Sequence, residues 1–593
     1  MPISDLVSSL LAKRGIQEGS VAAFLNPSFE EHLHDPMLLS DMPKAIERFF
    51  GALEKKERIA IYSDFDCDGV CGAAVFQDFF TRIGYKDFEI YLPHRDEEGY
   101  GFHPDAVKKI CERGASLIIT VDVGISGHKG VRAASDAGVD VIVTDHHEAM
   151  MGVPPALAVV NPKLPSTGST SSLQAGSGQV GAYPFPHLCG AAVAFKFVQA
   201  ALAEGKRREL PQFLSIPDGW EKWLLDVVAI ATIADMVSLS GENRVLVHYG
   251  LRVLRRSRRP GLRSLAAKAR MYLSSASEDD VGFSIAPRLN AASRMDKAEL
   301  AFQILTTDDA NEAERLAGLL EALNAKRKGI VANIVKDAKK RARARFEGGG
   351  LVTVLGDVAW KPALLGLAAN SVMNERGGVV CLWGRDASGA LKGSCRSDGA
   401  ISLADLFHEA SASFLQYGGH AFAGGFSVSN EAVHTLQEAL EAAAQKSARN
   451  SSVASESSHD ATLPLSAISE ALLRDVSLLS PFGIGNPKPI FHIAETRITG
   501  VRSFGKQSDH IEVMLECGTT GRRLRAFDFF KKPEHFTFPP VTGGDARVLG
   551  TLERDNYGSR NSIALRIVDV LPLCPDTNGH VAPVLRSESA RTY

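Results

Sequence analysis

Short apolar runs alternate with helical stretches between residue 58 and about residue 240, and this alternation restricts the fold more than any other feature. The runs that suit buried strands span residues 59–62, 90–92, 117–121, 139–143 and 157–160. Apolar residues recur at helical spacing in the segments between them, at 70–83, 104–113 and 129–137. Because strands that alternate with helices form parallel sheets, the sequence predicts an α/β fold with helices on both faces of a parallel sheet.

Three carboxylates follow the first of these runs at every second position. They are Asp64, Asp66 and Asp68, and Gly69 follows them where a tight turn can end the strand. On an extended backbone, side chains two residues apart point to the same side, so the three should converge. Like charges this close repel strongly unless cations neutralise them. The stretch therefore predicts a metal site.

Two other interpretations of this acidic stretch are weaker. A calcium-binding EF-hand loop also begins Asp-x-Asp-x-Asp-Gly, but it needs a glutamate at its twelfth position, where this chain has Val75. Such a loop also follows a helix, whereas residues 59–62 suit a buried strand. A solvated acidic turn is disfavoured by the apolar residues on both sides.

Other strand ends carry similar chemistry. Asp122 follows the run 117–121, and Asp145, His146 and His147 follow the run 139–143. Asp235 follows the apolar segment 224–233, which we also interpret as ending at this edge of the sheet. Ligand sites in such sheets form beyond the carboxyl ends of the strands, so these side chains should meet the first cluster.

Oxygen donors with one nitrogen suit Mn²⁺ or Mg²⁺ better than structural zinc. Several shared carboxylates suit two ions, which activate water and stabilise the leaving oxygen in a phosphodiester displacement. His147 could be a second nitrogen ligand, an electrophile toward the phosphate or a donor to a ligand carboxylate. The predicted metal ligands are Asp66, Asp68, Asp122, His146 and Asp235.

Composition sets wider limits. A chain of 593 residues should hold three or four domains, and a formal net charge of −3 neither favours nor excludes nucleic acid. The eight cysteines form no Cys-x-x-Cys pair, so we expect free thiols in a reducing cytosol. Neither a signal peptide nor an apolar span of about 18 residues is apparent, so we expect a cytoplasmic protein without membrane contact.

Changes in composition and in apolar patterning along the chain predict its division into domains. A helical region (1–56) precedes the α/β domain (57–300), in which the low-complexity stretch 164–182 predicts a flexible insertion. A connecting helix, a second α/β domain, a Ser-rich linker and a small β-barrel of short strands should follow, at residues 301–348, 349–447, 448–466 and 467–593.

These motifs together resemble the DHH phosphoesterase superfamily, and within it the RecJ-type single-strand-specific DNA exonucleases. The resemblance extends from about residue 11 to about residue 570 and also includes the motifs at 95–101, 288–294, 393–397 and 418–425. It implies a DHH domain, a DHHA1-like second domain and an OB-fold. It further implies a monomeric enzyme of DNA repair and recombination that degrades single-stranded DNA from the 5′ end to mononucleotides, using two Mn²⁺ or Mg²⁺ ions. A helicase and a single-strand-binding protein are the implied partners.

The resemblance also implies roles for particular residues. The five predicted ligands would hold the metals, with Asp64 and His147 supporting them. Those that would read the 5′ phosphate are Arg95, Ser394 and Arg396. Arg288, Asn290 and Arg294 lie in a motif whose residues contact the substrate backbone. His420 would face the scissile phosphate, with Gly418 and Gly419 permitting close backbone approach.

Three positions depart from the family pattern. Phe65 stands where a tyrosine is usual, Lys361 where a histidine is usual and Ala363 where a glycine is usual. Basic runs and interleaved aromatic residues are further candidates for DNA contact. They are residues 252–259, the run 339–345, and the barrel residues Arg502, Phe504, Lys506, Arg522, Arg523, Arg525 and Phe527.

Two other function classes remain as alternatives. The first is a phosphodiesterase for short oligonucleotides or cyclic dinucleotides, with a pyrophosphatase close to it. The small phosphodiesterases lack an OB-fold and an extra amino-terminal region, so the length of this chain argues against them. The second is a non-catalytic replication scaffold, which would not need to keep all five metal ligands.

Overall fold

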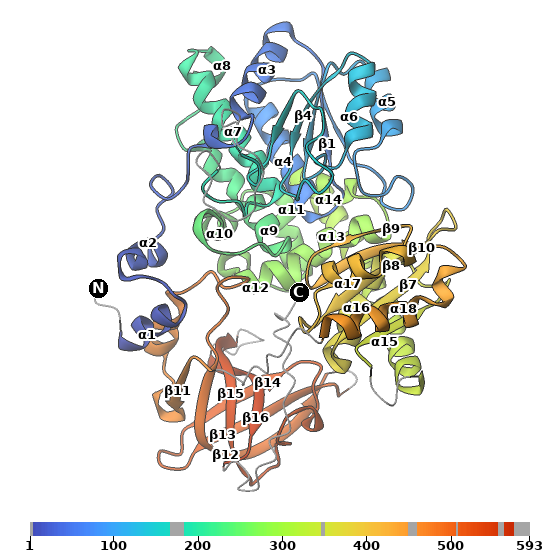
Figure 1. Cartoon of the computed structure of the whole chain (residues 1–593). Helices are drawn as coiled ribbons and strands as arrows, with labels where there is room; N and C mark the ends of the chain where they lie inside the picture. The colour runs from blue at the N-terminus through green and yellow to red at the C-terminus, as the bar shows by residue number, and fades with distance from the viewer. Residues whose placement is uncertain are drawn as a thin grey trace. The chain divides into compact units, whose positions relative to one another are not determined.

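The structure is a computed structural model that describes residues 4–165, 183–345, 350–448, 459–505, 508–555 and 562–573. The chain forms two compact units, one of residues 28–452 and one that joins residues 1–27 to residues 453–586. Most of the predicted insertion, residues 166–182, lies outside the described residues. Figure 1 shows the elements of both units.

The first unit contains a five-stranded sheet in which all strands are parallel, in the order β2-β1-β3-β4-β5. This confirms the predicted parallel α/β fold. The strands are β1 (Ile59–Ser63), β2 (Phe88–Tyr91), β3 (Leu117–Val121), β4 (Asp140–Thr144) and β5 (Ala158–Val160).

Helices cover both faces of this sheet (Figure 1). Ile59 and Ile61 face a core shared with α3 (Met42–Lys55), α4 (Cys67–Arg82) and α7 (Gly190–Arg207). Ala60 and Tyr62 face a second core shared with α5 (Pro104–Glu112) and α6 (His128–Asp136). The strand is buried on both faces, which explains its continuous apolar sequence.

The apolar segment 224–233 is a helix and not a strand. It forms α9 (Leu225–Ala234), which packs against α4, α7 and α10 (Gly241–Leu254). Asp235 is the residue that caps the C-terminal end of α9, so the expectation that it follows a strand was wrong. A helix that is apolar all round has no periodicity to distinguish it from a buried strand.

Further helices lead to the second domain. They are α8 (Pro211–Leu214), α11 (Pro260–Lys268), α12 (Glu278–Asp280), α13 (Ala286–Met295), α14 (Glu299–Thr306) and the long α15 (Ala310–Arg345). The second domain has the strand order β6-β7-β8-β10-β9, in which only β6 and β7 pair in parallel. Its elements are β6 (Val352–Gly356), α16 (Pro362–Arg376), β7 (Val379–Arg385), β8 (Leu391–Ser397), α17 (Leu403–Glu409), β9 (Gln416–Gly419), β10 (Ala423–Val428) and α18 (Leu436–Ala448).

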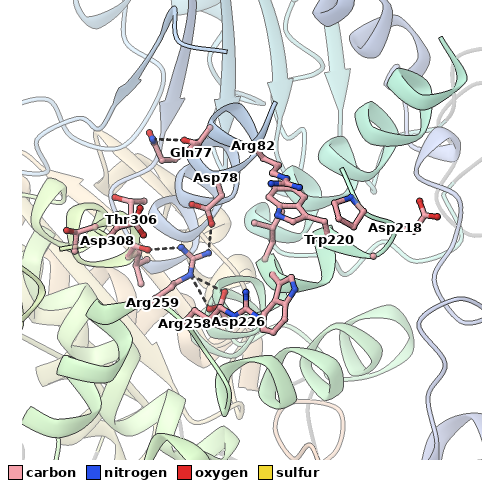
Figure 2. Close-up of a pocket in the computed structure, with 17 residues that line it drawn as sticks. Gln77, Asp78, Arg82, Asp218, Trp220, Asp226, Arg258, Arg259, Thr306 and Asp308 are labelled. Atoms are coloured by element: carbon pink, nitrogen blue, oxygen red, sulfur yellow. Dashed lines mark hydrogen bonds and ion pairs between the residues drawn. The ribbon is translucent and has the colours of Figure 1, made fainter. Parts of the chain in front are cut away.

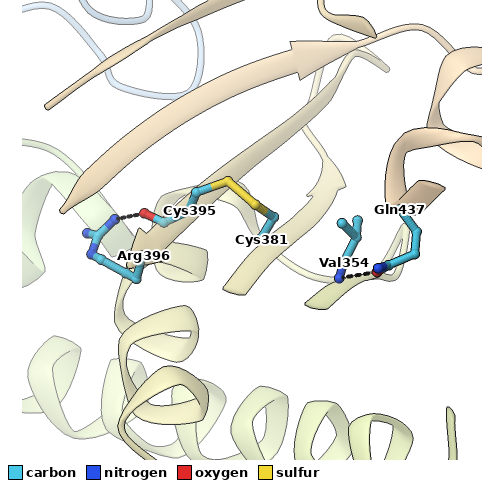
Figure 3. Close-up of a disulfide and its surroundings, with 5 residues drawn as sticks. All are labelled: Val354, Cys381, Cys395, Arg396 and Gln437. Carbon is cyan, nitrogen blue, oxygen red and sulfur yellow. Dashed lines mark hydrogen bonds between the residues drawn. A yellow bond between two sulfur atoms is a disulfide. The ribbon is translucent and has the colours of Figure 1, made fainter. Parts of the chain in front are cut away.

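Two cysteines of this domain form a disulfide, against the expectation of free thiols. Cys381 on β7 and Cys395 on β8 lie directly opposite each other in the antiparallel pair, with Cα atoms 4.1 Å apart (Figure 3). Their separation of 14 residues follows from the hairpin between the two strands, and a search for Cys-x-x-Cys pairs does not detect it. The free cysteines among the described residues are Cys67, Cys71, Cys111, Cys189 and Cys517.

The second unit is a closed five-stranded barrel, in agreement with the predicted OB-like fold. Its strands are β12 (Phe491–Phe504), β13 (His510–Cys517), β14 (Arg523–Asp528), β16 (Ser562–Leu571) and β15 (Asp545–Asp555), and the pairing of β15 with β12 closes the barrel. α1 (Asp5–Lys13) contributes Val7, Leu10 and Leu11 to the barrel's core. The remaining elements are α2 (Val21–Leu25), β11 (Ala461–Pro464) and α19 (Glu470–Ser477).

Candidate active site

The three aspartates after β1 converge, but not by alternation along a strand. Asp64 follows β1 directly, whereas Asp66 is the N-cap of α4. Oδ1 of Asp66 accepts hydrogen bonds from the backbone N–H groups of Asp68 (2.9 Å) and Gly69 (3.2 Å). Asp68 therefore lies in the first turn of a helix, and the expected extended backbone was wrong there.

Gly69 serves close packing in this first turn. A Cβ atom at this position would lie 2.3 Å from the carbonyl oxygen of Asp64. Any side chain would push the start of α4 away from the end of β1. The glycine thus keeps Asp64 and Asp68 close together.

The N-terminus of α7 holds the carboxylate of Asp68. Its two oxygens accept from the backbone N–H groups of Gly190 (2.6 Å) and Ala191 (2.8 Å), where the helix dipole favours negative charge. A Cβ atom at Gly190 would lie 2.4 Å from Cβ of Asp122. Gly190 is therefore a site residue that sequence analysis missed, because no local motif marks it.

The ends of β3 and β4 place the next group. Asp122 has a φ of +60°, a left-handed conformation that is uncommon for aspartate and that recurs at functional sites. The fully buried Asp145 accepts from Nδ1 of His147 (2.8 Å) and from the backbone N–H groups of His146, His147 and Ile125. Asp145 thus orients the imidazole of His147, with Nδ1 toward its own carboxylate.

His146 lies at the centre of the cluster. Its Nε2 atom is 3.1 Å from Oδ1 of Asp122, 3.7 Å from Oδ2 of Asp235 and 3.8 Å from Oδ2 of Asp68. Three groups have ligand atoms within 4.8 Å of one another: Asp64 with Asp66 and Asp122, Asp68 with His146 and Asp235, and Asp122 with His146 and His147. The structure thus brings together all five predicted ligands with Asp64 and His147.

Burial and mutual repulsion shift the pKa values in this cluster. Burial, and then the charge of Asp66, raise the pKa of Asp64 to about 8 and that of Asp68 to about 6. Burial also raises the pKa values of Asp122 and Asp235 well above their usual range. Burial and the neighbouring His147 lower the pKa of His146 to about 3, so it is neutral and able to donate a lone pair.

Four buried atoms of the cluster have no hydrogen-bond partner among the described residues. They are Oδ1 of Asp64, Oδ1 of Asp122, Nε2 of His146 and Oδ2 of Asp235. Buried polar atoms without a hydrogen-bond partner cost free energy, and all four are carboxylate oxygens or an imidazole nitrogen, which are atom types that can ligate metals. The donor set and its unmet bonding capacity therefore fit divalent cations.

Four arginines gather beside the metal cluster. The guanidinium of Arg95 lies 4.0 Å over the ring of Phe65. The phenylalanine that replaces the usual tyrosine thus forms a cation–π contact with this arginine. Burial, and then the charges of Arg95, Arg327 and Arg396, lower the pKa of Arg294 to about 9. These four arginines are half-buried, and like charges gathered in this way favour the binding of an anion.

Arg327 was not predicted from the sequence. It lies on α15 between Lys326 and Lys328, in a helix whose many basic residues give no reason to select it. Its Nε atom is buried without a hydrogen-bond partner among the described residues, as is Nε of Arg95. Only the packing of α15 against α13 shows that this one cation faces the cluster.

Two other predicted substrate contacts have structural partners. Arg288 donates to Glu321 (2.6 Å) and to the carbonyl of Ser284 (2.7 Å), and the arginine is 7% exposed. Oδ1 of Asn290 accepts from the backbone N–H of Cys67 (3.0 Å) and so supports the start of α4. These contacts occupy the Arg288 guanidinium and one end of the Asn290 amide.

The departures at 361 and 363 form contacts between the two domains of the first unit. Nζ of Lys361 lies 2.9 Å from Oδ2 of Asp96, the residue after Arg95. The carbonyl of Ala363 accepts from Nη1 of Arg294 at 2.7 Å. These contacts hold α16 beside the arginine cluster, although the chain lacks the usual histidine and glycine.

Ser394 and Arg396 lie on β8. Nη1 of Arg396 donates to the carbonyl of Cys395 at 2.7 Å (Figure 3). Burial lowers the pKa of Arg396. Gly418 and Gly419 end the exposed strand β9, and a Cβ atom at Gly419 would lie 2.4 Å from the carbonyl oxygen of Ala423. His420 is exposed in the turn that follows, and no side-chain contact joins it to the metal cluster among the described residues.

Two of the three basic candidates, the run 339–345 and the barrel residues, are largely paired within the protein. Arg341 pairs with Asp337 and Asp357, and both Lys339 and Arg343 pair with Glu375. On the barrel, Arg502 and Arg525 share Glu512, while Arg523 pairs with Glu516. These pairs reduce the positive charge that either run offers to a nucleic acid.

Comparison with known proteins agrees with the site. Residues 58–232 match the DHH family N-terminal domain, residues 347–447 match the DHHA1 domain, and residues 459–569 match the RecJ OB domain. The single-stranded-DNA-specific exonuclease RecJ of Bacillus subtilis is 32% identical over 96% of this chain and 68% of its own length. RecJ of Escherichia coli is 31% identical over 90% of this chain and 91% of its own.

A solved structure of a RecJ protein also resembles this chain. RecJ of Thermus thermophilus in complex with Mn²⁺ superposes with a TM-score of 0.75 and 28% identity, over 96% of this chain and 76% of that one. Fold and site together define a metal-dependent phosphoesterase of the DHH family. Within that class, the chain belongs to the RecJ family.

Proposed function

We propose that this protein hydrolyses single-stranded DNA from its 5′ end and releases mononucleotides, using two divalent cations. The observation that carries the proposal is the set of four unpaired, buried ligand atoms, on Asp64, Asp122, His146 and Asp235, beside a cluster of arginines. Both halves of a phosphodiesterase site are thus present. One half binds cations, and the other binds the phosphate.

Asp66, Asp68, Asp122, His146 and Asp235 would hold the metals, with Asp64 close enough to share one of them. Bound Mn²⁺ or Mg²⁺ supplies an activated water and neutralises charge on the phosphate. The protein's own part is to fix the ligands. The N-terminus of α7 orients Asp68, and a neutral His146 presents Nε2 to the cluster.

His147 would act beside the ligands. Burial opposes its protonation, but the hydrogen bond and the charge of Asp145 raise the pKa of His147 overall. An imidazole that is readily protonated here can donate a proton, or a hydrogen bond, to an oxygen of the substrate. Asp145 would serve as the residue that positions it.

The arginine cluster would receive the 5′ phosphate. Guanidinium groups pair bidentately with phosphate oxygens, and Arg95, Arg294 and Arg396 raise the local positive charge together. Gly366 leaves space for this, because a Cβ atom there would lie 2.7 Å from Nη2 of Arg396. Ser394, on the same strand as Arg396, would add a hydroxyl donor.

The barrel would contribute a surface for stacking bases. Rings of Phe504, His510 and Phe529 lie with centroids 5.1–6.0 Å apart, and Phe530 packs on His510 at 4.8 Å. The guanidinium of Arg566 lies 4.5 Å over the ring of Phe529, which is 39% exposed. Aromatic faces with nearby arginines bind single strands without sequence preference.

A helicase and a single-strand-binding protein would be partners in repair and recombination, since duplex DNA must be opened before a single strand can be degraded. None of the described helices is long and apolar enough to cross a membrane. The short-oligonucleotide phosphodiesterase remains the second candidate function. The barrel disfavours it, because a dinucleotide does not need a separate stacking surface.

The deciding experiment uses single-stranded DNA labelled at either end, with Mn²⁺ or with EDTA. We expect mononucleotides from the 5′ end of the single strand, little cleavage of the matching duplex, and no cleavage with EDTA. Release from the 3′ end would contradict the polarity. Cleavage limited to di- and trinucleotides would favour the second candidate, and binding without cleavage would indicate a scaffold.

A further inference from the structure

A pocket lies away from the metal cluster, along the C-terminal half of α4 (Figure 2). Its volume is about 880 Å³, within the range of small-molecule sites. Asp78 on its wall is ten residues beyond Asp68, which places it roughly 15 Å further along the same helix. The pocket therefore cannot be part of the metal site.

Two indoles and two arginines form its distinctive wall. Trp220 and Trp223 come from one short helix, residues Trp220–Leu224. The guanidinium of Arg258 lies 4.4 Å over the ring of Trp223, and that of Arg82 lies 5.9 Å over the ring of Trp220. Trp223 remains 41% exposed, so its indole is accessible from solvent.

The floor of the pocket is a closed network of charges. Arg259 donates to Asp78 (2.6 Å), to both oxygens of Asp226 (3.1 and 3.2 Å) and to the carbonyl of Leu305 (2.7 Å), as Figure 2 shows for the two ion pairs. Ser257 donates a further hydrogen bond to Asp226. These contacts use the bonding capacity of the Arg259 guanidinium.

Arg82 and Arg258 differ from Arg259. Neither has a carboxylate partner among the described residues, and both are exposed. Each guanidinium lies over an indole ring, and its N–H groups have no hydrogen-bond partner among the residues that the structure describes. Two oriented cations beside an accessible aromatic face suit a ligand that has both an anionic group and a planar ring.

The overall charge of the pocket limits the size of that ligand. Three arginines line it, together with four aspartates: Asp78, Asp218, Asp226 and Asp308. A groove for a nucleic-acid strand carries an excess of positive charge, which this pocket lacks. A single phosphate can be neutralised by Arg82 and Arg258, and the Asp308 carboxylate can accept from a base amine or a sugar hydroxyl.

From these contacts we propose that the pocket binds a nucleoside monophosphate. The base would stack on the wall formed by Trp223 and Arg258, and the phosphate would pair with the free arginines. The basic run 252–259 thereby divides into two roles. Arg259 stabilises the fold, while Arg258 serves the ligand.

The test is a titration of the full chain with deoxyadenosine monophosphate in EDTA, followed by calorimetry and by tryptophan fluorescence. An Arg396→Ala background removes the phosphate pocket beside the metal cluster. We expect binding to persist in that background. Arg258→Met and Trp223→Ala should each weaken it about tenfold or more, the factor that loss of one stacking contact gives.

Deoxyadenosine and inorganic phosphate serve as half-ligands, and each should bind at least about tenfold more weakly than the nucleotide. Circular dichroism and thermal unfolding check that the variants fold. Equal binding by the parent and both pocket variants would overturn the proposal, as would loss of binding with Arg396→Ala alone. Tighter binding of a hexanucleotide at the same residues would show that the ligand is a strand and also overturn it.

Discussion

Two clusters of buried charge lie near the two ends of α4, and they are built in opposite ways. Near its C-terminal half, Arg259 pairs with Asp78 and Asp226, so two carboxylates share a cation that the chain supplies. Near its N-terminus, Asp64, Asp66 and Asp122 lie close together, and several buried carboxylate and imidazole atoms of the cluster have no hydrogen-bond partner among the described residues.

The difference separates a structural site from a functional one. Burial raises the pKa of Asp78 as well, but the charge and the hydrogen bond of Arg259 oppose that shift. At the metal end, the charge of Asp66 adds to burial and raises the pKa of Asp64 to about 8. Buried charge is tolerated where a partner is present, and where it is not, the protein depends on a bound cation.

The largest expected effect is the loss of activity on removing a carboxylate from the metal cluster near the N-terminus of α4. Asp122→Asn should lower exonuclease activity by about 10³-fold or more, since it removes a predicted ligand of the metal ions that would stabilise transition-state charge. The same change should raise the melting temperature of the metal-free protein, because it relieves repulsion. Turnover assays with Mn²⁺ and thermal unfolding in EDTA measure the two effects.

Asp136→Asn is the matched control, since Asp136 is an exposed aspartate at the end of α6. It should change neither quantity. A variant at Asp122 that kept full activity would contradict the metal assignment. One that lost activity and also stability would mean that this carboxylate is structural.

Removing a charge from the cluster around Arg259 should lower stability, whereas removing one from the metal cluster should raise it. Arg259→Met leaves Asp78 and Asp226 buried without a cation, and we expect a loss of about 3–5 kcal/mol in the free energy of unfolding. Urea denaturation measures it. The adjacent Arg258→Met should stay within about 0.5 kcal/mol of the parent, because Arg258 is exposed. Equal losses of unfolding free energy in Arg258→Met and Arg259→Met would mean that the ion pairs of Arg259 do not stabilise the fold.

The pH dependence of stability tests the same difference without mutation. The folded-state pKa values of Asp64 (about 8) and Asp68 (about 6) exceed their unfolded value, so the folded state binds more protons between about pH 4 and 8. Stability of the metal-free protein should therefore fall by roughly 2–5 kcal/mol as pH rises through this window. Urea unfolding in EDTA from pH 5 to 8 measures this slope.

Saturating Mn²⁺ should flatten or reverse the slope, because the ion replaces the protons. Asp64→Asn should reduce the slope in EDTA. Stability that rises with pH in EDTA would show that these carboxylates are compensated within the fold, as those around Arg259 are.

The smallest effect is expected from removing an ion pair between the DHH domain and the second α/β domain. Lys361→Met removes an ion pair with Asp96 in which both side chains are about one-third exposed, so the free energy of unfolding should fall by less than about 1 kcal/mol. The KM for 5′-phosphorylated strands should change more than kcat, since Asp96 adjoins Arg95. A large loss of stability would mean that this contact holds the domains together.

Much of the site could be predicted from local sequence. The acidic residues after residues 59–62 and the Asp145-His146-His147 motif follow buried strands, and parallel strands carry such residues to one edge. The predicted secondary structure was wrong at two places, where the same sequence pattern is compatible with both a strand and a helix. Asp66 and Asp68 suit an extended strand, but they belong to a helix cap. The segment before Asp235 suits a buried strand, but it is α9.

The sequence by itself determined the ligand types, their order along the chain and the fold class, because these follow from periodicity and from the chemistry of each side chain. Tertiary structure alone decided that Gly190 must be small, that Arg327 lies beside the other arginines of the cluster and that Cys381 lies opposite Cys395. It also decided that Arg258 and Arg259, adjacent in sequence, have different contacts. Such properties depend on contacts between distant segments, and burial and electrostatic interaction act through space and not along the chain.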